Sequence, residues 1–253
     1  MQFFNYPEFE VIVVNDGSTD ATRDVVRQVA AGVPQVRVLE NPGNRGKGFS
    51  VRHGMLEANG DFILMSDADL STPIGELDNL GQALEEADVA IGSRGLPESR
   101  LERRQPIHRE TMGRAFNLMV RMVALPGIHD SQCGFKLFRR QAARAIFERT
   151  TIDGFGFDVE ALFLARRLGF RVAEVPVRWI DHPASKVHPI RDSTRMAADL
   201  LRIRLRHGGF GVLAASDLGP LARRARVEPR GRRGLRAAGE AREDDVVARH
   251  PLA

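Results

Sequence analysis

The fold is indicated most clearly by the stretch Phe62-Ile63-Leu64-Met65-Ser66-Asp67-Ala68-Asp69-Leu70-Ser71, in which an apolar run ends in two carboxylates. The run has the length and composition of a buried strand, and Pro73 interrupts regular structure shortly after it. Carboxylates this close repel each other, and a hard divalent cation held by oxygen ligands neutralises them well. The stretch therefore predicts a Mg²⁺ or Mn²⁺ site at a strand end, with an acidic turn that caps the next helix as the alternative.

A similar unit lies upstream, where the run Phe9–Val14 is followed by the polar segment Asn15–Asp20. The run is rich in β-branched residues, as is typical of a central parallel strand. Ligands of open α/β sheets bind beyond the carboxyl ends of the strands, so Asp16 is predicted to face a binding crevice. Its carboxylate could accept hydrogen bonds from a nucleobase or a ribose, and a plain helix N-cap is the alternative.

A glycine-rich basic loop, Asn41–Gly48, follows the short predicted strand Val36–Leu39 and precedes a helix predicted from Phe49 to Asn59. Its glycines allow close backbone approach, and Arg45 and Lys47 place positive charge near the start of the helix, so the loop suits an anion. Its spacing differs from that of a Walker A loop and of the dinucleotide fingerprint, which excludes both of these nucleotide-binding classes.

Taken in order, these three segments resemble the inverting family 2 glycosyltransferases of the GT-A fold. The resemblance covers about residues 8–205 and continues through Ile91–Arg94, Asp130–Lys136 and Gly154–Glu160. Within the family, the stretches Glu174–Trp179 and Lys186–Ser193 look most like dolichyl-phosphate β-glucosyltransferases and their bacterial polyprenyl-phosphate relatives. A strand followed by Asp-x-Asp is also typical of haloacid dehalogenase phosphatases, but that family explains neither the first acidic segment nor the Gly-Phe-Asp segment.

The resemblance implies an α/β fold with a mostly parallel central sheet flanked by helices, in a catalytic domain over residues 1–207. Family members normally begin with a further strand and helix that carry a Pro-x-Tyr-Asn-Glu segment, and here only Met1–Pro7 stands in that place. We therefore expect the sheet to lack its usual first strand and to leave a strand edge unpaired. Residues 208–253 are rich in Arg, Ala, Gly and Glu, a composition that predicts a disordered tail.

The implied reaction moves a hexose, with inversion, from a nucleotide-diphosphate sugar to the phosphate of a polyprenol or dolichol. UDP-glucose is the favoured donor, and mannose is the alternative sugar. The resemblance assigns the metal to Asp67 and Asp69, with Ser71 as a further ligand, and donor binding to Asp16, Lys47 and Asp67. The metal would act as a Lewis acid on the departing diphosphate.

The acceptor side involves a carboxylate and three cations. Asp158 occupies the family's base position, but a phosphate monoester has a second pKa of about 6 and attacks without a strong base, so we expect Asp158 to orient a substrate. Glu160 is expected to be a solvated carboxylate of the same helical turn. Arg94 is expected to be a catalytic residue. It is also the first candidate among the cations that bind the acceptor phosphate, and Arg109 and Lys186 are the next candidates.

Composition agrees with one α/β unit, since the chain has 253 residues of which 43% are hydrophobic. The single cysteine, Cys133, excludes an internal disulfide, fits a reducing cytoplasm and is expected to be buried. The net charge of +4 and the pI of about 9.9 predict an anionic partner. Lipid head groups or a lipid phosphate fit better than nucleic acid, because no helix-turn-helix, zinc site or aromatic stacking platform is visible.

A basic amphipathic helix predicted over residues 193–206 indicates a peripheral location at the inner face of the cell membrane, although its apolar side could equally pack on the catalytic core. No apolar stretch has the length of a transmembrane helix, and the first residues lack the features of a signal peptide. Two other function classes stay open. One is a catalytically inactive nucleotide-sugar-binding protein, and the other is an interaction module bound to anionic membranes.

Overall fold

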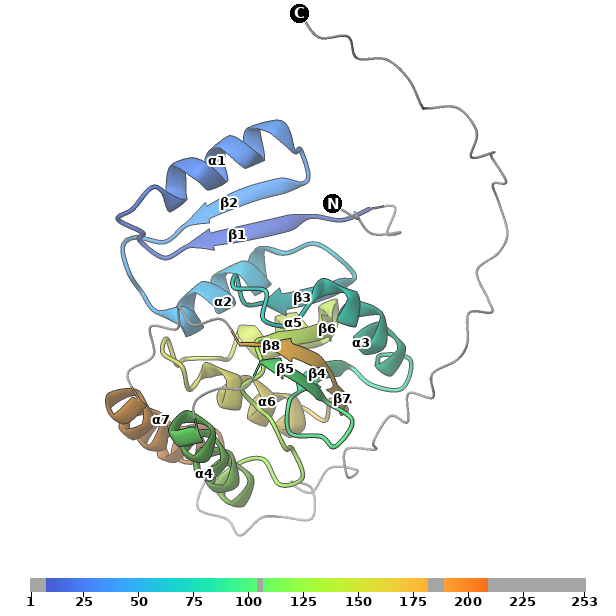
Figure 1. Ribbon diagram of the computed structural model, residues 1–253, viewed down its shortest axis with the longest axis vertical. Coiled ribbons are helices and arrows are strands. Elements are labelled where there is room, and N and C mark those ends of the chain that lie inside the picture. The colour runs from blue at the N-terminus through green and yellow to red at the C-terminus, as the bar shows by residue number, and fades with distance from the viewer. Residues whose placement is uncertain (1–7, 104–106, 182–188, 209–253) are drawn as a thin grey trace, which may run out of the picture.

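A four-stranded sheet with the order β3-β6-β4-β7 lies at the centre of the computed structural model, which describes residues 8–103, 107–181 and 189–208 (Figure 1). The strand β6 runs antiparallel to both of its neighbours, and β4 and β7 run parallel to each other. All residues of β4 are buried, as expected for a strand covered on both faces. The strands are β3 (Phe62–Ser66), β4 (Val89–Ser93), β6 (Phe135–Arg139) and β7 (Val172–Pro176).

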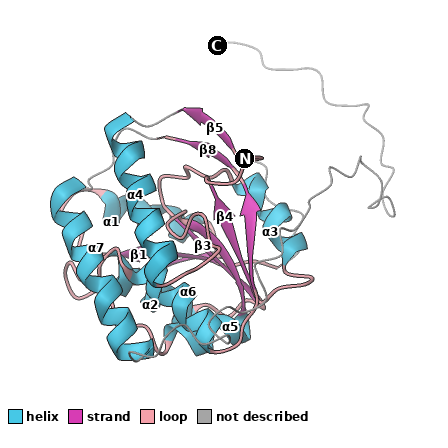
Figure 2. Cartoon of the chain, turned by 90° about the horizontal axis from the view of Figure 1, so that it is seen from below, coloured by secondary structure: helices cyan, strands magenta, loops and turns pink. Residues whose placement is uncertain are grey.

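Helices cover both faces of this sheet (Figure 2). On one face α3 (Leu77–Ala83) buries Leu80 against Phe135 and Val175. The other face carries a larger core, in which residues 157–165 of α6 are all buried, as in a helix enclosed on every side. The helices of this larger core that contact the sheet are α2 (Lys47–Glu57), α5 (Arg140–Phe147) and α6 (Phe157–Arg167).

Two further helices, α4 (Ile107–Val123) and α7 (Pro189–Ile203), lie side by side on the outside of the larger core (Figure 1). Met196, Leu200 and Ile203 of α7 are buried, so the apolar side of the predicted basic helix packs on the core. A short π-helical turn, Arg204–Gly208, follows α7. No helix in the described ranges is long and apolar enough to cross a membrane.

The two remaining sheets have two strands each. β1 (Val11–Asn15) pairs in parallel with β2 (Val36–Glu40), and α1 (Thr22–Gly32) connects them. Elsewhere β5 (Arg100–Arg103) pairs in parallel with β8 (Arg178–Ile180). A short 3₁₀ turn, Ile74–Glu76, precedes α3.

The arrangement of the sheets agrees with the expectation of an unpaired strand edge. In the described part of the chain β1 pairs only with β2 and β3 pairs only with β6, so the strands before β3 form a separate sheet. The segment Glu174–Trp179 is divided between two strands: β7 ends at Pro176, and β8 begins at Arg178 and pairs with a different neighbour. The helix α2 packs against both β1 and β3 and so joins the two sheets. The expected disordered tail, residues 208–253, lies outside the described residues apart from Gly208.

Candidate active site

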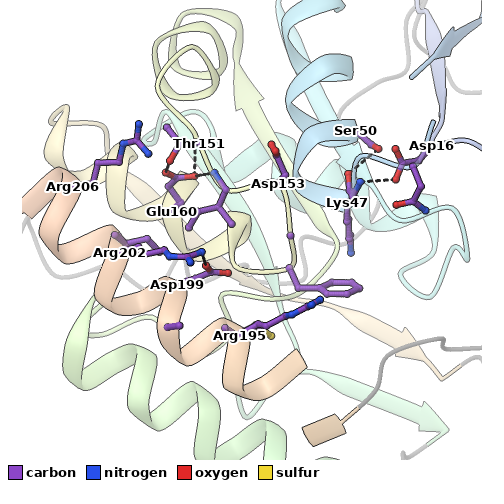
Figure 3. Close-up of a pocket in the computed structure, with 18 of the residues that line it drawn as sticks. Asp16, Lys47, Ser50, Thr151, Asp153, Glu160, Arg195, Asp199, Arg202 and Arg206 are labelled. Atoms are coloured by element: carbon purple, nitrogen blue, oxygen red, sulfur yellow. Dashed lines mark hydrogen bonds and ion pairs between the residues drawn. The ribbon is translucent and has the colours of Figure 1, made fainter. Parts of the chain in front are cut away.

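Three predicted site residues follow directly on strand ends. Asp16 comes after β1, Asp67 after β3 and Arg94 after β4. The loop before the antiparallel strand β6 reaches the same edge, since the Asp67 amide donates to Gly134 O at 2.8 Å. A pocket of about 1360 Å³ begins at Asp16 and the start of α2 and runs along α7 (Figure 3). Of the three residues, Asp16 lines this pocket, Asp67 lies beside it through its contact with the lining residue Lys47, and Arg94 is not among the residues that line it.

The Asp16 carboxylate is held by the loop that leads into α2. Its Oδ1 accepts hydrogen bonds from Asn41 Nδ2 and from the Arg45 amide, both at 2.8 Å, and its Oδ2 accepts one from the Gly46 amide at 2.8 Å. Burial raises the pKa of Asp16, but the hydrogen bonds from Arg45, Asn41 and Gly46 outweigh burial and bring the pKa below its usual value. Asp16 is thus an ionised, fixed acceptor on the wall of the pocket.

The glycine-rich loop packs against the protein itself. A Cβ atom on Gly46 would lie 2.5 Å from Asp153 O, and one on Gly48 would lie 2.2 Å from Ile152 O. The Gly48 amide donates to Asp153 O at 2.7 Å, and Arg52 binds the Asp153 carboxylate at 2.6 Å. The prediction that these two glycines make room for a bound anion is wrong, because their amides already serve acceptors of the chain.

Lys47, the first residue of α2, reaches the acidic end of β3. Its Nζ lies 2.8 Å from Asp67 Oδ1. The neighbouring backbone at Gly134 has no space for a side chain, since a Cβ atom there would lie 2.0 Å from Asp67 Oδ2. Burial lowers the pKa of Lys47, but the charges of Asp158, Asp67 and Asp69 outweigh burial and raise it. Lys47 is therefore a firmly protonated cation beside the predicted metal carboxylates.

Asp158 is enclosed rather than open to the pocket. It is 4% exposed, and its Oδ1 lies 2.5 Å from Nζ of Lys136, which also donates to Cys133 O at 2.6 Å. Burial raises the pKa of Asp158, and the charges of Lys136 and Lys47 only partly offset this effect. The prediction of a buried cysteine is confirmed, because Cys133 is 0% exposed and burial raises the pKa of its thiol to about 11.

The predicted metal ligands form an incomplete coordination set. Asp69 is exposed, and its Oδ1 accepts a hydrogen bond from the Ser71 amide at 2.9 Å. In the described ranges no three His, Cys, Asp or Glu side chains lie close enough together to hold a metal ion. Mg²⁺ commonly takes one or two carboxylates and completes its shell with substrate phosphates and water. Asp67 and Asp69 therefore fit a divalent cation that is bound together with a diphosphate.

Arg94 lies at the same edge, but its charge is already balanced. Its Nε and Nη2 donate to the two carboxylate oxygens of Asp130 at 2.6 and 2.9 Å, and its guanidinium lies 5.4 Å from the centre of the Trp179 ring. Burial raises the pKa of Asp130, but the ion pair with Arg94 outweighs it and lowers the pKa to about 2. A phosphate-binding role for Arg94 stays a prediction. The side chains of Arg109 and Lys186 lie outside the described part of the structure.

The structure overturns the prediction for Glu160. This side chain is 0% exposed and accepts hydrogen bonds from the Thr151 and Ile152 amides at 2.8 Å. His207 Nε2 lies 2.8 Å from its Oε1. Glu160 therefore ties the loop before α6 to the turn after α7 and is not solvated. No local pattern indicates this role, because His207 lies far away along the chain.

The sequence assigns no role to Lys136 or Asp130, although both belong to a segment that resembles the family. Lys136 stands between Phe135 and Leu137 in an apolar run, a contrast that could have marked it, whereas the polar neighbours of Asp130 give no such signal. Both side chains are almost fully buried, at 1% and 2% exposed. Buried charges are stable only when paired, so each of them predicts a partner nearby without identifying it.

Comparison with known proteins identifies the family. The model of glycosyl transferase family 2 matches residues 1–147 of the 253-residue chain. The chain belongs to this family. This family 2 chain is 38% identical over 207 residues to the dolichyl-phosphate beta-glucosyltransferase of Dictyostelium discoideum, an alignment that covers 79% of the chain and 63% of the relative. It is 40% identical over 208 residues to the enzyme of the same name from Drosophila melanogaster, with 79% and 64% covered. The chain thus spans slightly less than two thirds of these relatives.

Solved structures support the same fold. The family 2 chain superposes on glucosyl-3-phosphoglycerate synthase from Mycobacterium tuberculosis in complex with Mn²⁺, UDP and glucosyl-3-phosphoglycerate with a TM-score of 0.56 at 21% identity, covering 80% of this chain and 70% of that one. A complex of the same synthase with Mn²⁺ and UDP-glucose gives a TM-score of 0.56 at 20% identity, with 79% and 68% covered. The fold of the family 2 chain is the GT-A fold.

Proposed function

We propose that this chain transfers a hexose, glucose in the first place, from UDP-sugar to the phosphate of a polyprenol or dolichol with inversion. The supporting observation is that Asp16 and Lys47 line one pocket in a family 2 chain, that Lys47 binds Asp67, and that the charge of Asp69 acts on Lys47. The sugar and the acceptor follow from the similarity to dolichyl-phosphate beta-glucosyltransferases.

On the donor side, Asp69 and Asp67 would hold Mg²⁺ or Mn²⁺, which stabilises the negative charge of the departing diphosphate as a Lewis acid. Lys47 lies within 2.8 Å of Asp67 and brings a second positive charge to that position. Asp16 presents carboxylate oxygens with remaining lone pairs on the pocket wall, where a ribose or a nucleobase can donate to them.

On the acceptor side, no strong base is needed. A phosphate monoester is largely dianionic at pH 7, so one of its oxygens can attack the anomeric carbon directly from the face opposite the nucleotide. The burial of Asp158 and its contact with Lys136 support an orienting role, since a carboxylate that is 4% exposed has little access to a substrate. We propose that Asp158 positions the two lysines near it.

The test is a transfer assay with radiolabelled UDP-glucose, a short-chain polyprenyl phosphate and saturating Mn²⁺. The substitution Asp69→Asn should reduce transfer by about 100-fold or more, because it removes a charge that stabilises the transition state. Thermal melting should change little, since Asp69 is exposed. A matched control is Asp61→Asn, which makes the same change at the opposite end of β3, on a carboxylate that is 86% exposed.

Two outcomes would contradict the proposal. Near-normal transfer activity in Asp69→Asn would contradict the assignment of Asp69 as a metal ligand. Binding of UDP-glucose by the unmodified chain without transfer to any polyprenyl phosphate would identify an inactive nucleotide-sugar-binding protein. Parallel assays with UDP-glucose and GDP-mannose decide which sugar is transferred.

We also propose peripheral attachment to the inner face of the cell membrane. Four apolar side chains on the adjacent helices α4 and α7 and on the turn after α7 are exposed: Leu118 at 49%, Met122 at 64%, Leu201 at 56% and Leu205 at 50%. Apolar side chains flanked by arginines are typical of surfaces that lie in a membrane interface. Such a surface would bring the pocket close to a lipid-borne acceptor.

Sedimentation with phosphatidylglycerol vesicles tests this attachment. The double substitution Leu201→Ser and Leu205→Ser should lower the bound fraction several-fold, while phosphatidylcholine vesicles should bind the unmodified chain weakly. Unchanged binding by the double variant would contradict the proposed surface. Strong vesicle binding that survives Asp67→Asn and Asp69→Asn, together with an absence of transfer by the unmodified chain, would favour an interaction module.

A further inference from the structure

The charged side chains that line the large pocket differ in whether they are paired with a partner of opposite charge or a hydrogen-bond donor. Its carboxylates all have hydrogen-bonding or ionic partners in the described residues. Asp16 accepts from loop amides, Asp153 binds Arg52, Glu160 accepts from Thr151 and His207, and Asp199 binds Arg202 at 3.2 Å. Among the cations that line it, Lys47 binds Asp67. The negative side chains of the pocket are therefore already compensated.

Arg195 is different from these groups. It lies on α7, lines the pocket and is exposed, and its side chain extends toward the end of the pocket that holds Lys47 (Figure 3). It makes no hydrogen bond or ion pair with the described residues, and a longer-range effect of its charge opposes the raised pKa of Asp199. The backbone of α7 is fixed there, because Met196 is buried beside it. Arg195 thus places an uncompensated guanidinium at the predicted donor end of the pocket.

We infer that Arg195 binds the phosphate group of the acceptor, a phosphate monoester of an isoprenoid alcohol. A dianion brought next to a nucleotide diphosphate needs a cation that no carboxylate has already neutralised. Arg94 does not meet this condition, because Asp130 binds it through two hydrogen bonds. A guanidinium presents a planar pair of donors that matches two phosphate oxygens. This assignment rests on the proposed function for the identity of the ligand.

A matched control lies on the same side of the same pocket. Arg206 lines the pocket at its other end, beside Thr151 and Glu160, and is exposed like Arg195 (Figure 3). Replacing either arginine by glutamine removes one positive charge from the same surface. Of these two arginines, only Arg195 lies near Lys47. A difference in ligand binding between the two variants is therefore caused by the position of the lost charge and not by the change in net charge.

The experiment measures binding of farnesyl phosphate to the full chain by calorimetry, without metal or donor. Arg195→Gln should weaken binding by about tenfold to 100-fold, the usual size of a lost hydrogen bond to a charged group. Arg206→Gln should stay within about twofold, and Arg195→Lys should fall between. Farnesol should bind weakly to every variant, and inorganic phosphate should bind the unmodified chain more weakly than farnesyl phosphate. In transfer assays, Arg195→Gln should raise KM for the acceptor and leave KM for UDP-glucose unchanged.

Several results would overturn the inference. These are unchanged binding in Arg195→Gln, an equal loss in both arginine variants, no measurable binding by the unmodified chain, and tighter binding of inorganic phosphate than of farnesyl phosphate. Failure of the proposed function would look different. In that case no sugar transfer would occur, yet the calorimetric comparison of Arg195→Gln with Arg206→Gln would still decide whether Arg195 binds a phosphate monoester.

Discussion

At Gly134 the absence of a side chain determines where the Asp67 carboxylate lies. A methyl group at this position would overlap Asp67 Oδ2, which lies 2.0 Å from the Cβ site. Gly134→Ala should therefore push Asp67 away from Lys47, destabilise the fold by about 1–3 kcal/mol and weaken Mn²⁺-dependent binding of UDP-glucose. Urea unfolding and calorimetry measure the two effects.

The control for this substitution is Gly81→Ala. Gly81 lies within α3, and a Cβ atom there has no neighbour within 4 Å. Alanine should therefore stabilise the helix by up to about 1 kcal/mol and leave donor binding unchanged. If Gly134→Ala binds donor and unfolds like the unmodified chain, the steric account of Asp67 is wrong.

Lys136 and Asp158 form a buried ion pair whose removal should have a pH signature. Lys136→Met leaves the Asp158 charge buried without its nearest partner, at a cost of about 3–5 kcal/mol. The pKa of Asp158 is raised above 3.8 in the folded chain, so folding favours its protonated form, and its contribution to stability falls as pH rises from 3.8 through the raised pKa. Without Lys136 that pKa rises further, and the loss extends to higher pH.

We therefore expect the difference in unfolding free energy between the unmodified chain and Lys136→Met to grow from pH 4 to pH 8. Urea unfolding at several pH values measures this difference. Adding Asp158→Asn to Lys136→Met should remove the growth, because no titrating carboxylate remains at that position. A difference that is constant over this range would show that Asp158 does not titrate as its surroundings imply.

The predictability of the site differs from residue to residue. Asp16, Asp67 and Asp69 could be located from the sequence because each follows a recognisable strand. The burial of Glu160 could not, since it depends on His207 and on amides of a loop that only the folded chain brings together. The same holds for Arg94, whose neutralisation by Asp130 is a contact between separate loops.

At the scale of elements, the strands β1 and β4 differ in protection from solvent. Every residue of β4 is buried between β6 and β7, whereas β1 has an exposed Val11 and only Asn15 fully buried. Local opening is easiest where few apolar contacts are lost. Hydrogen-bonded amides of β1 and β2 should therefore exchange at least about tenfold faster than those of β4.

Hydrogen–deuterium exchange with mass spectrometry measures these rates on peptides that cover residues 9–16, 35–41 and 88–94. Matched solution conditions and correction for intrinsic exchange rates make the peptides comparable. Equal protection of the three segments would mean that β1 and β2 open only when the whole domain unfolds.

Strand and helix positions were largely predictable, and strand partners were not. Apolar runs indicate β1, β2 and β3, and apolar periodicity indicates α7 to within a few residues of its start at Pro189. The same periodicity cannot tell that the chain changes partner at Val177, between β7 and β8. Pairing depends on residues far apart in the sequence, which a local pattern does not record.

At the scale of the whole molecule, the residues proposed to bind the donor are distributed over two sheets. Asp16 follows β1, and Asp67 follows β3, and in the described part of the chain these strands belong to separate sheets. Both residues are nevertheless fixed with respect to α2, because the loop before this helix binds Asp16 and its first residue, Lys47, binds Asp67. The helix α2 therefore fixes the position of Asp16 relative to Asp67, which hydrogen bonds between adjacent strands would otherwise fix.

The pocket is open to redesign because its walls come from separate elements, with the end of β1 and the start of α2 on one side and the loop before α6 and the helix α7 on the other. A site that spans adjacent hydrogen-bonded strands can change width only in steps of about 4.8 Å. Here the width of the pocket depends on the distance between α2 and β1. The two elements pack closely where Gly54 faces Val14. A directed-evolution library that seeks bulkier sugars should therefore vary Gly54 and its helical neighbours and keep the carboxylates constant. Substitutions that lift the helix slightly would enlarge the pocket in increments finer than one strand.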